Sequence, residues 1–353
     1  MLAAPLFAQS LQFHGFVMAR AVRAKAPESW TTGGFGKFDI GGDHTRNADV
    51  AQLGIDWTPM TWLTMHADGL ARNSVAAGNG RRAGLVQAYV ELFSDRWRFR
   101  AGHFWLPTSR ENVDPLWNSR YTITYSALNT WTGQEFRPIG ADLQFSPDFY
   151  FTAGATAFRG NETMGTLLAA RGWTLGNRLT LFNETLPTAQ ARTRPFSSDT
   201  GGKTGFSERV RIQLPERALL QGTHVDNRAE LYPGTPPDVP WRTRYDTLGT
   251  TIGVTSPTTF AAEWMWGSTT VGFPHGTFRL HMNTVYGLLS HRIGNERLTA
   301  RVERFKTDLE HGNATTLAWL HDMNPNARAG VEYVRASGKN GGSTVTLELR
   351  YGF

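Results

Sequence analysis

Hydrophobic and polar residues alternate along most of this chain with a period of two. In the last eleven residues, apolar side chains occupy every second position from Val345 to Phe353, and polar side chains occupy every second position from Thr344 to Arg350. Successive side chains of a β-strand point to opposite faces, so this period predicts a strand with one apolar and one polar face. A surface strand of a soluble sandwich would alternate in the same way, so the stretch alone leaves both classes open.

The same alternation recurs from Ser10 onward, in paired runs of about strand length. Turns rich in Gly, Pro, Asn and Asp are expected to separate the members of each pair. We expect seven such turns, after Trp57, Phe93, Phe145, Trp173, Thr255, Arg292 and Met323. Together with eight longer connections, they predict sixteen antiparallel strands. No run of about 18 apolar residues occurs, so the sequence predicts no membrane-spanning helix.

The position of the last strand favours one class. It ends in Phe353 at the C-terminus, and in this it resembles the final strand of bacterial outer-membrane β-barrel proteins. The resemblance implies an all-β fold, a transmembrane antiparallel up-and-down β-barrel of about sixteen strands, in the bacterial outer membrane and in contact with its lipid. Aromatic residues such as Trp57, Trp62 and Trp97 crowd the short-turn ends, as a girdle at the membrane interface predicts. We expect residues 9–353 to form one barrel domain and residues 1–8 to be the tail of a signal peptide.

Composition narrows the chemistry further. The chain has 353 residues and a formal net charge of +6, and only five of its 36 basic residues are lysines. Acidic residues are interspersed with the arginines, which argues against nucleic-acid binding. The absence of cysteine excludes disulfides and thiolate metal sites. The ten histidines are spread singly and no nucleotide-binding or hydrolase motif occurs, so no cofactor, metal site or enzymatic activity is expected.

The inward faces of the predicted strands are rich in charge. So many charges predict a wet lumen rather than a dry packed plug, and sixteen strands leave room for a channel. For any single residue, pairing with an opposite charge on a neighbouring strand is the alternative. The pore-lining candidates are Glu91, Arg98, Arg100, Arg279, Arg301, Glu303, Arg328, Glu332, Glu348 and Arg350.

The third long connection, about residues 106–136, supplies a second set of candidates. In sixteen-stranded general porins, which the pattern resembles, the third loop folds into the barrel and narrows it. By that resemblance the constriction would be formed by Arg110, Glu111, Asp114, Arg120, Glu135 and Arg137. An ordinary outer loop with solvated charges is the alternative. A transverse field between acidic and basic walls would orient permeants, and an arginine excess would favour anions.

Two stretches, residues 100–111 and 135–140, also resemble the phosphate-selective porin O and P family. In residues 100–111, as in that family, an Arg-x-Gly strand runs into a proline and then an acidic residue, and residues 135–140 are a second patch of similarity. That family's anion path uses an arginine ladder and a lysine cluster, and the five scattered lysines here make no cluster. Phosphate selectivity is therefore not implied.

The pattern favours an outer-membrane porin for passive diffusion of small hydrophilic solutes, weakly favouring anions. The family resemblance implies a homotrimer. One alternative is a non-conducting scaffold barrel that binds a partner protein through a long fifth connection, about residues 187–242. A barrel-embedded hydrolase using His66 and Asp68 is the other.

Overall fold

The computed structural model of the chain describes residues 10–353, apart from residues 75, 78–79, 114–115, 188–191, 195–198, 216, 232–238 and 254–255. The predicted signal-peptide tail and Asp114 lie outside this part of the chain. Within it, the barrel wall consists of β1 (Ser10–Lys25), β3 (Val50–Met60), β4 (Leu63–Arg72), β5 (Ala83–Phe93), β6 (Trp97–His103), β7 (Ile139–Phe145), β8 (Phe151–Arg159), β11 (Gly205–Leu214), β12 (Ala218–Asp226), β13 (Trp241–Ile252), β14 (Thr258–Phe273), β15 (Gly276–Ile293), β16 (Glu296–Thr307), β17 (His311–Asp322), β18 (Ala327–Ala336) and β19 (Gly342–Gly352). The prediction of sixteen strands is confirmed.

Smaller elements lie beside and inside this wall. The three-residue strand β2 (Thr45–Asn47) pairs with β1 just beyond the end of β3, and β9 (Leu186–Pro187) pairs with β10 (Arg192–Thr193). The short helix η1 (Trp30–Thr32) lies in the first long connection, α1 (Ala127–Glu135) in the third and α2 (Thr166–Arg171) in the fourth. None of the described helices is long and apolar enough to cross a membrane.

The first and last strands close the barrel. β1 pairs with β3 along its first half and with β19 along its second half, and both pairings are antiparallel. The terminal Phe353 and Gly15 exchange two backbone hydrogen bonds of 3.0 and 3.1 Å. A closed ring leaves no strand edge unpaired, which a wall in hydrocarbon requires.

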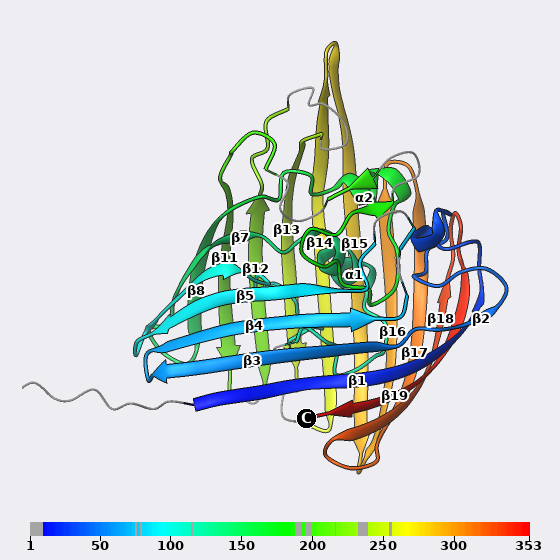
Figure 1. Cartoon of the computed structure of the whole chain (residues 1–353), viewed down its shortest axis with the longest axis horizontal. Coiled ribbons are helices and arrows are strands. Elements are labelled where there is room, and N and C mark those ends of the chain that lie inside the picture. The colour runs from blue at the N-terminus through cyan, green and yellow to red at the C-terminus, as the bar shows by residue number, and fades with distance from the viewer. Residues whose placement is uncertain are drawn as a thin grey trace, which may run out of the picture.

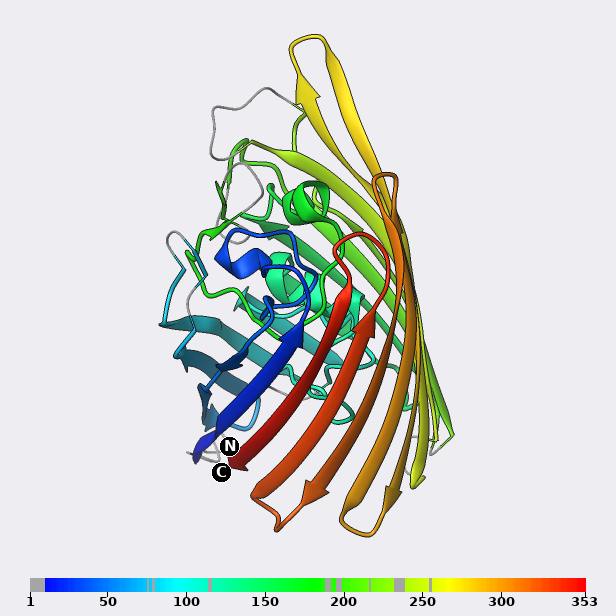
Figure 2. The same cartoon turned by 90° about the vertical axis from the view of Figure 1, so that its right-hand side faces the viewer.

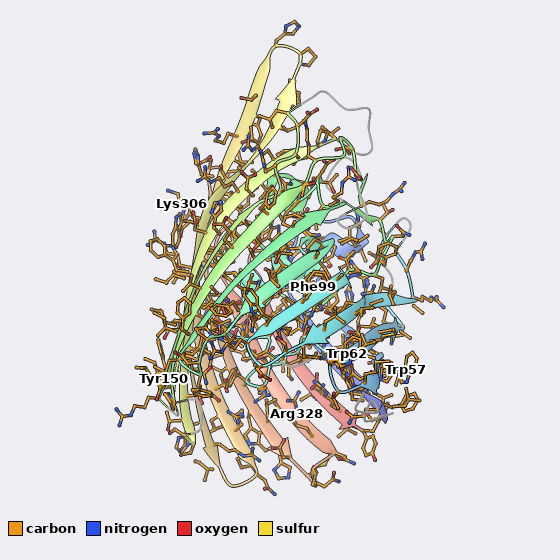
Figure 3. The ribbon with its side chains drawn as sticks, turned by 90° about the vertical axis from the view of Figure 1, so that its left-hand side faces the viewer. Trp57, Trp62, Phe99, Tyr150, Lys306 and Arg328 are labelled. Atoms are coloured by element: carbon orange, nitrogen blue, oxygen red, sulfur yellow. The ribbon has the colours of Figure 1, made fainter. Side chains whose placement is uncertain are left out.

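The outer face of the ring is apolar. Val302, Leu289 and Leu347 point outward and are 60%, 54% and 53% exposed. A continuous belt of such side chains is stable in lipid rather than in water, so the barrel spans a membrane. Figure 3 shows Trp57 and Trp62 in the lower half of the view, at the short-turn end, as the sequence predicted.

Seven connections between successive strands are short turns at one end of the barrel, and eight lie at the other end. One predicted turn was wrong. Residues 176–178 do not join two strands but belong to the fourth long connection, residues 160–204, and the actual short connection is the one between β11 and β12. The predicted fifth connection, residues 187–242, was wrong for the same reason, because β11 and β12 lie within it. The true fifth connection runs only from residue 227 to residue 240.

The interior is largely filled by the third and fourth connections. Figures 1 and 2 show α1 within the ring of strands and α2 closer to the end opposite the short turns. All nine residues of α1 are buried. Trp131 and Phe136 of the third connection pack with Trp173 of the fourth and with Tyr245 and Met265 of the wall. The expectation of a mainly wet lumen was therefore wrong, because loops carry apolar side chains inward that strand periodicity does not reveal.

Candidate functional site: an arginine-lined cavity

A cavity of about 460 Å³ remains inside the barrel near the short-turn end. Its wall side is formed by β5 to β8 and β11 to β13, mostly close to their short turns. Arg98 is the second residue of β6, and Gln144 is the last but one of β7. Its inner side is formed by the third connection, where Trp105 and Trp117 stack 4.1 Å apart. The cavity thus lies where the folded-in connection meets the wall.

Six arginines surround this cavity, and no acidic residue is among its described lining residues. Tyr89, Tyr121, Gln144 and Gln221 add hydrogen-bonding groups to the lining. The wall contributes Arg98, Arg100, Arg209 and Arg211, and the third connection contributes Arg110 and Arg120.

Only part of this charge is neutralised by ion pairs. Arg100 lies 2.5 Å from a Glu91 carboxylate oxygen, and Arg98 lies 3.8 Å from the same atom. Arg209 donates to both carboxylate oxygens of Asp142, at 2.6 and 2.7 Å. Two carboxylates thus serve three of the six guanidinium groups.

The other three arginines form no ion pair with any described carboxylate. Arg211 donates only to the hydroxyl of Thr152, at 3.1 Å, and Nε of Arg110 is buried without a partner. Burial lowers the pKa of Arg110, and the charge of Glu263 opposes this, yet a guanidinium stays protonated in proteins. Among the described residues, the arginines that line the cavity thus outnumber the carboxylates paired with them, and this surplus of positive charge can bind anions.

Four of these arginines were candidates from the sequence, two for the pore lining and two for the constriction. Arg98, Arg100, Arg110 and Arg120 all line the cavity, with Glu91 beside it. Arg209 and Arg211 were missed because β11 was assigned to a loop. A readable signal existed: Val210, Ile212 and Leu214 are exposed on the outer face and alternate with the two arginines.

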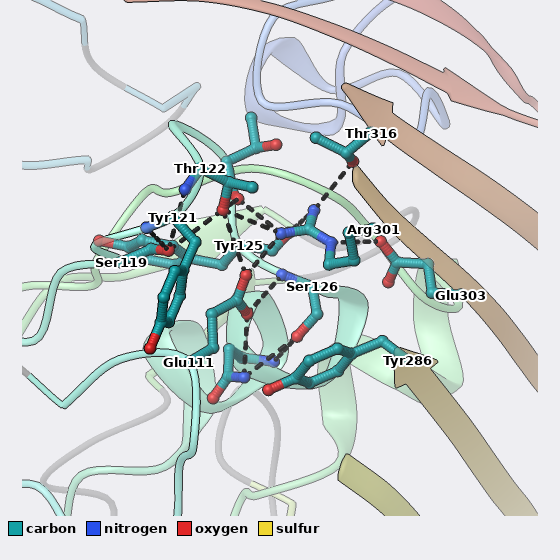
Figure 4. Close-up of polar contacts among 12 residues, drawn as sticks. Glu111, Ser119, Tyr121, Thr122, Tyr125, Ser126, Tyr286, Arg301, Glu303 and Thr316 are labelled. Carbon is teal, nitrogen blue, oxygen red and sulfur yellow. Dashed lines mark hydrogen bonds and ion pairs between the residues drawn. The ribbon is translucent and has the colours of Figure 1, made fainter. Parts of the chain in front are cut away.

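Three predicted pore-lining residues instead anchor the third connection, contrary to the prediction. Arg301 is fully buried and donates to Glu111 at 2.5 Å, to the carbonyls of Thr124 and Tyr125 at 2.8 and 3.0 Å, and to Glu303 at 3.1 Å (Figure 4). Glu303 in turn accepts a hydrogen bond from the backbone of α1. The third of these residues, Glu332, is also buried and accepts from the backbone amides of residues 123 and 124 at 2.6 and 2.9 Å. The alternative of structural pairing therefore holds for Arg301, Glu303 and Glu332.

Glu111, Glu135 and Arg137 were predicted to form the constriction and are fully buried as well. Burial raises the pKa of Glu135 to about 7. Three hydrogen bonds oppose this shift because they favour the charged carboxylate, and their donors are Trp131 Nε1 and the backbone amides of residues 165 and 167. The two bonds from the backbone amides tie the third connection to the fourth. Arg137 donates to His103 at 3.1 Å and to the Thr180 carbonyl. None of the three lines the cavity, so the constriction prediction was wrong for them.

The remaining predicted residues lie elsewhere on the wall. Glu348 accepts from Arg20 at 2.9 Å and from Arg328 at 3.1 Å, and the Arg350 guanidinium lies 3.9 Å from the ring of Phe16. These inward-facing residues link β1, β18 and β19 and do not line the cavity. Arg279 is exposed and alternates with the buried Leu280 and Met282. It therefore faces outward, and its assignment to the lumen was wrong because the apolar residues of this part of β15 pack into the interior instead of facing lipid.

Comparison with known proteins supports the fold. No sequence-family model matches the chain, and no curated protein matches it at a significant level. The outer-membrane channel DcaP of Acinetobacter baumannii has a TM-score of 0.65 and 13% sequence identity, over 98% of this chain and 97% of that one. An anion-selective porin from Comamonas acidovorans has a TM-score of 0.61 and 11% identity, over 98% and 100%. OmpT of Vibrio cholerae in its trimer form has a TM-score of 0.60 and 8% sequence identity, over 98% of this chain and 100% of that one.

These similarities define the class of the protein. The chain has the closed sixteen-stranded fold of bacterial outer-membrane porins, and its apolar belt fits that location. It is an outer-membrane β-barrel. The resemblance to the porin O and P family has no support at the level of sequence.

Proposed function

We propose that the protein is a narrow outer-membrane channel for small hydrophilic solutes, and that its arginine-lined cavity favours anions. The observation that carries the proposal is the surplus of charge. Six arginines line a cavity of about 460 Å³, and two carboxylates, Glu91 and Asp142, form ion pairs with three of them. In a space with protein walls, such a surplus attracts anions and repels cations.

The filling of the lumen sets the expected size of the permeant. The third connection is held by the buried Arg301 and by contacts with the fourth connection, so it is a fixed part of the channel rather than a loose flap. A barrel narrowed in this way would conduct less than an open one of sixteen strands. We further propose a homotrimer, on the analogy of the trimer form of the Vibrio protein.

The two alternatives have less support. The scaffold hypothesis depended on a long fifth connection, and residues 205–214 and 218–226 of that segment are strands β11 and β12 of the wall. For a hydrolase, His66 would need a free ring nitrogen to activate a nucleophile. Its Nδ1 lies 2.7 Å from Asp56 and its Nε2 lies 3.3 Å from Asp68. Both nitrogens thus face carboxylates, and we propose no enzymatic activity.

Liposome swelling tests the proposal directly. Liposomes containing the purified barrel are diluted into iso-osmotic solutions of three solutes of matched size, one neutral, one anionic and one cationic. We expect swelling to be fastest with the anionic solute and slowest with the cationic one. Equal rates for all three would refute the anion preference, and no swelling with a correctly folded barrel would refute the channel.

A further inference from the structure

Three side chains with metal-ligand chemistry meet on the inner face of the wall. His14 of β1, Asp56 of β3 and His66 of β4 place one donor atom each within 4.8 Å of the others, and this is the only such group within the described residues. Strand pairing brings them together, because Asp56 lies opposite His66 and His14 lies opposite Gly54. A side chain at position 54 would collide with His14, since a Cβ there would lie 2.4 Å from Nε2. The glycine thus leaves room for the imidazole ring.

The contacts of Asp68 fix the orientation of His66. Asp68 accepts hydrogen bonds from the amide groups of Gln52, at 3.1 Å, and of Gln87, at 2.7 Å. Such a carboxylate is an acceptor, so the Nε2 of His66, 3.3 Å away, is the donor toward it. Nδ1 then faces Asp56, whose oxygen lies 2.7 Å away. Because Asp56 is an acceptor as well, Nδ1 carries a cation, which is either a second proton on the ring or a metal ion that draws the two atoms slightly apart.

His14 adds a third donor atom, which a metal ion can use and a second proton on His66 cannot. Its Nδ1 lies 3.3 Å from the second carboxylate oxygen of Asp56, and its Nε2 is buried without a hydrogen-bond partner. Two ligands of a tetrahedral zinc ion, each bound at about 2.0–2.1 Å, are about 3.3 Å apart. His14 and Asp56 already have that separation, and their side chains are 27% and 28% exposed, which leaves access for an ion and a water molecule.

We propose that His14, Asp56 and His66 form a binding site for a divalent transition-metal ion of the zinc type. Two imidazole nitrogens and one carboxylate oxygen suit Zn²⁺, with a water molecule in the fourth position. Asp68 holds His66 in the required tautomer, as carboxylates beside zinc-bound histidines commonly do. No metal-ligand spacing is visible in the sequence because the three ligands come from three different strands.

The site is close to the arginine-lined cavity. The ring of His66 stacks on Tyr89 at 4.7 Å, and the guanidinium of Arg100 lies 4.3 Å above the same tyrosine ring. Tyr89 and Arg100 both line the cavity. A bound divalent ion would therefore add positive charge beside it.

Calorimetric titration of the untagged, chelator-treated barrel with Zn²⁺ tests the proposal. We expect one ion per chain, and Co²⁺ in its place should give the visible absorption bands of a tetrahedral site. His66→Ala and His14→Asn should each abolish the titration, and Asp68→Asn should weaken it by about 10- to 100-fold. His224→Ala is the matched control, because His224 pairs with Asp246 at 2.7 Å but has no third ligand, and it should bind as wild type does.

Heat-modifiable migration on gels shows whether each variant is folded. The proposal is overturned if the folded wild type binds no Zn²⁺, or if His14→Asn binds it like the wild type. If His66→Ala fails to fold, His14→Asn decides alone, since its position is half-buried. Because conduction by the metal-free barrel does not require the ion, this result and the test of the channel are independent.

Discussion

Neutralising the unpaired arginines of the cavity should abolish most of its preference for anions. Arg110, Arg120 and Arg211 form no ion pair with a described carboxylate, so each can be changed to glutamine without leaving a carboxylate partner unpaired. A sphere of 460 Å³ has a radius of about 5 Å, which places a guanidinium about 8 Å from an ion at its centre. At about 8 Å in water, one charge stabilises an anion, and destabilises a cation, by about 0.5 kcal/mol.

The ratio of anion to cation permeability depends on the difference between these two effects, about 1 kcal/mol for each arginine. Screening in about 0.1 M salt, where the Debye length is about 10 Å, reduces this difference by about half. The triple variant Arg110→Gln, Arg120→Gln, Arg211→Gln should therefore lower the permeability ratio by about tenfold, since about 1.4 kcal/mol corresponds to a factor of ten.

Reversal potentials in a planar bilayer with a KCl gradient measure this ratio. Arg279→Gln is the matched control, because it removes the same charge from an exposed, outward-facing position, and its reversal potential should equal that of the wild type. The reasoning is refuted if the triple variant keeps the wild-type reversal potential, or if Arg279→Gln changes it by as much.

Three further substitutions test the account of the fold. Arg301→Gln leaves buried carboxylates without their partner and should lower the free energy of unfolding by about 3–5 kcal/mol. We expect a lower unfolding temperature and a noisier open-channel current. Arg304→Gln, which changes an exposed arginine of the same strand, should alter neither. Val302→Arg puts a charge in the lipid-facing belt and should lower the free energy of unfolding, measured with denaturant in vesicles, by about 2–4 kcal/mol. A loss of stability no larger than that of Val302→Leu would contradict the assigned belt. Trp173→Ala should cost about 3–5 kcal/mol and raise the conductance by loosening the interior, and an unchanged conductance would argue against the packed lumen.

Periodicity in the sequence was enough to predict the wall. The last strand was predicted from alternation alone, and its outward residues Val345 and Tyr351 are exposed as expected. The strand number was right although one turn was misplaced. Residues 176–178 have the composition of a hairpin turn, but in the structure the amides of Asn177 and Arg178 donate to Asp39 inside the barrel. Local turn chemistry is the same in both settings, so the sequence did not distinguish them.

The interior was harder to predict, because its contacts join distant parts of the chain. Arg301 and Glu111 are 190 residues apart, and strand periodicity only says that Arg301 points inward. Whether an inward charge meets water or a folded-in loop depends on where the loop packs. The arginines of the cavity and the buried anchors therefore looked alike in the sequence, and the metal-ligand group was invisible for the same reason.

Single-channel recording of the wild-type protein in a planar bilayer with a KCl gradient tests the central claim most directly. The account predicts discrete open-channel steps, smaller than those of an open sixteen-stranded barrel, with a reversal potential of the sign for anions. A reversal potential of the sign for cations would contradict the role given to the arginine-lined cavity. Silence from a barrel shown to be folded and inserted would contradict the channel itself.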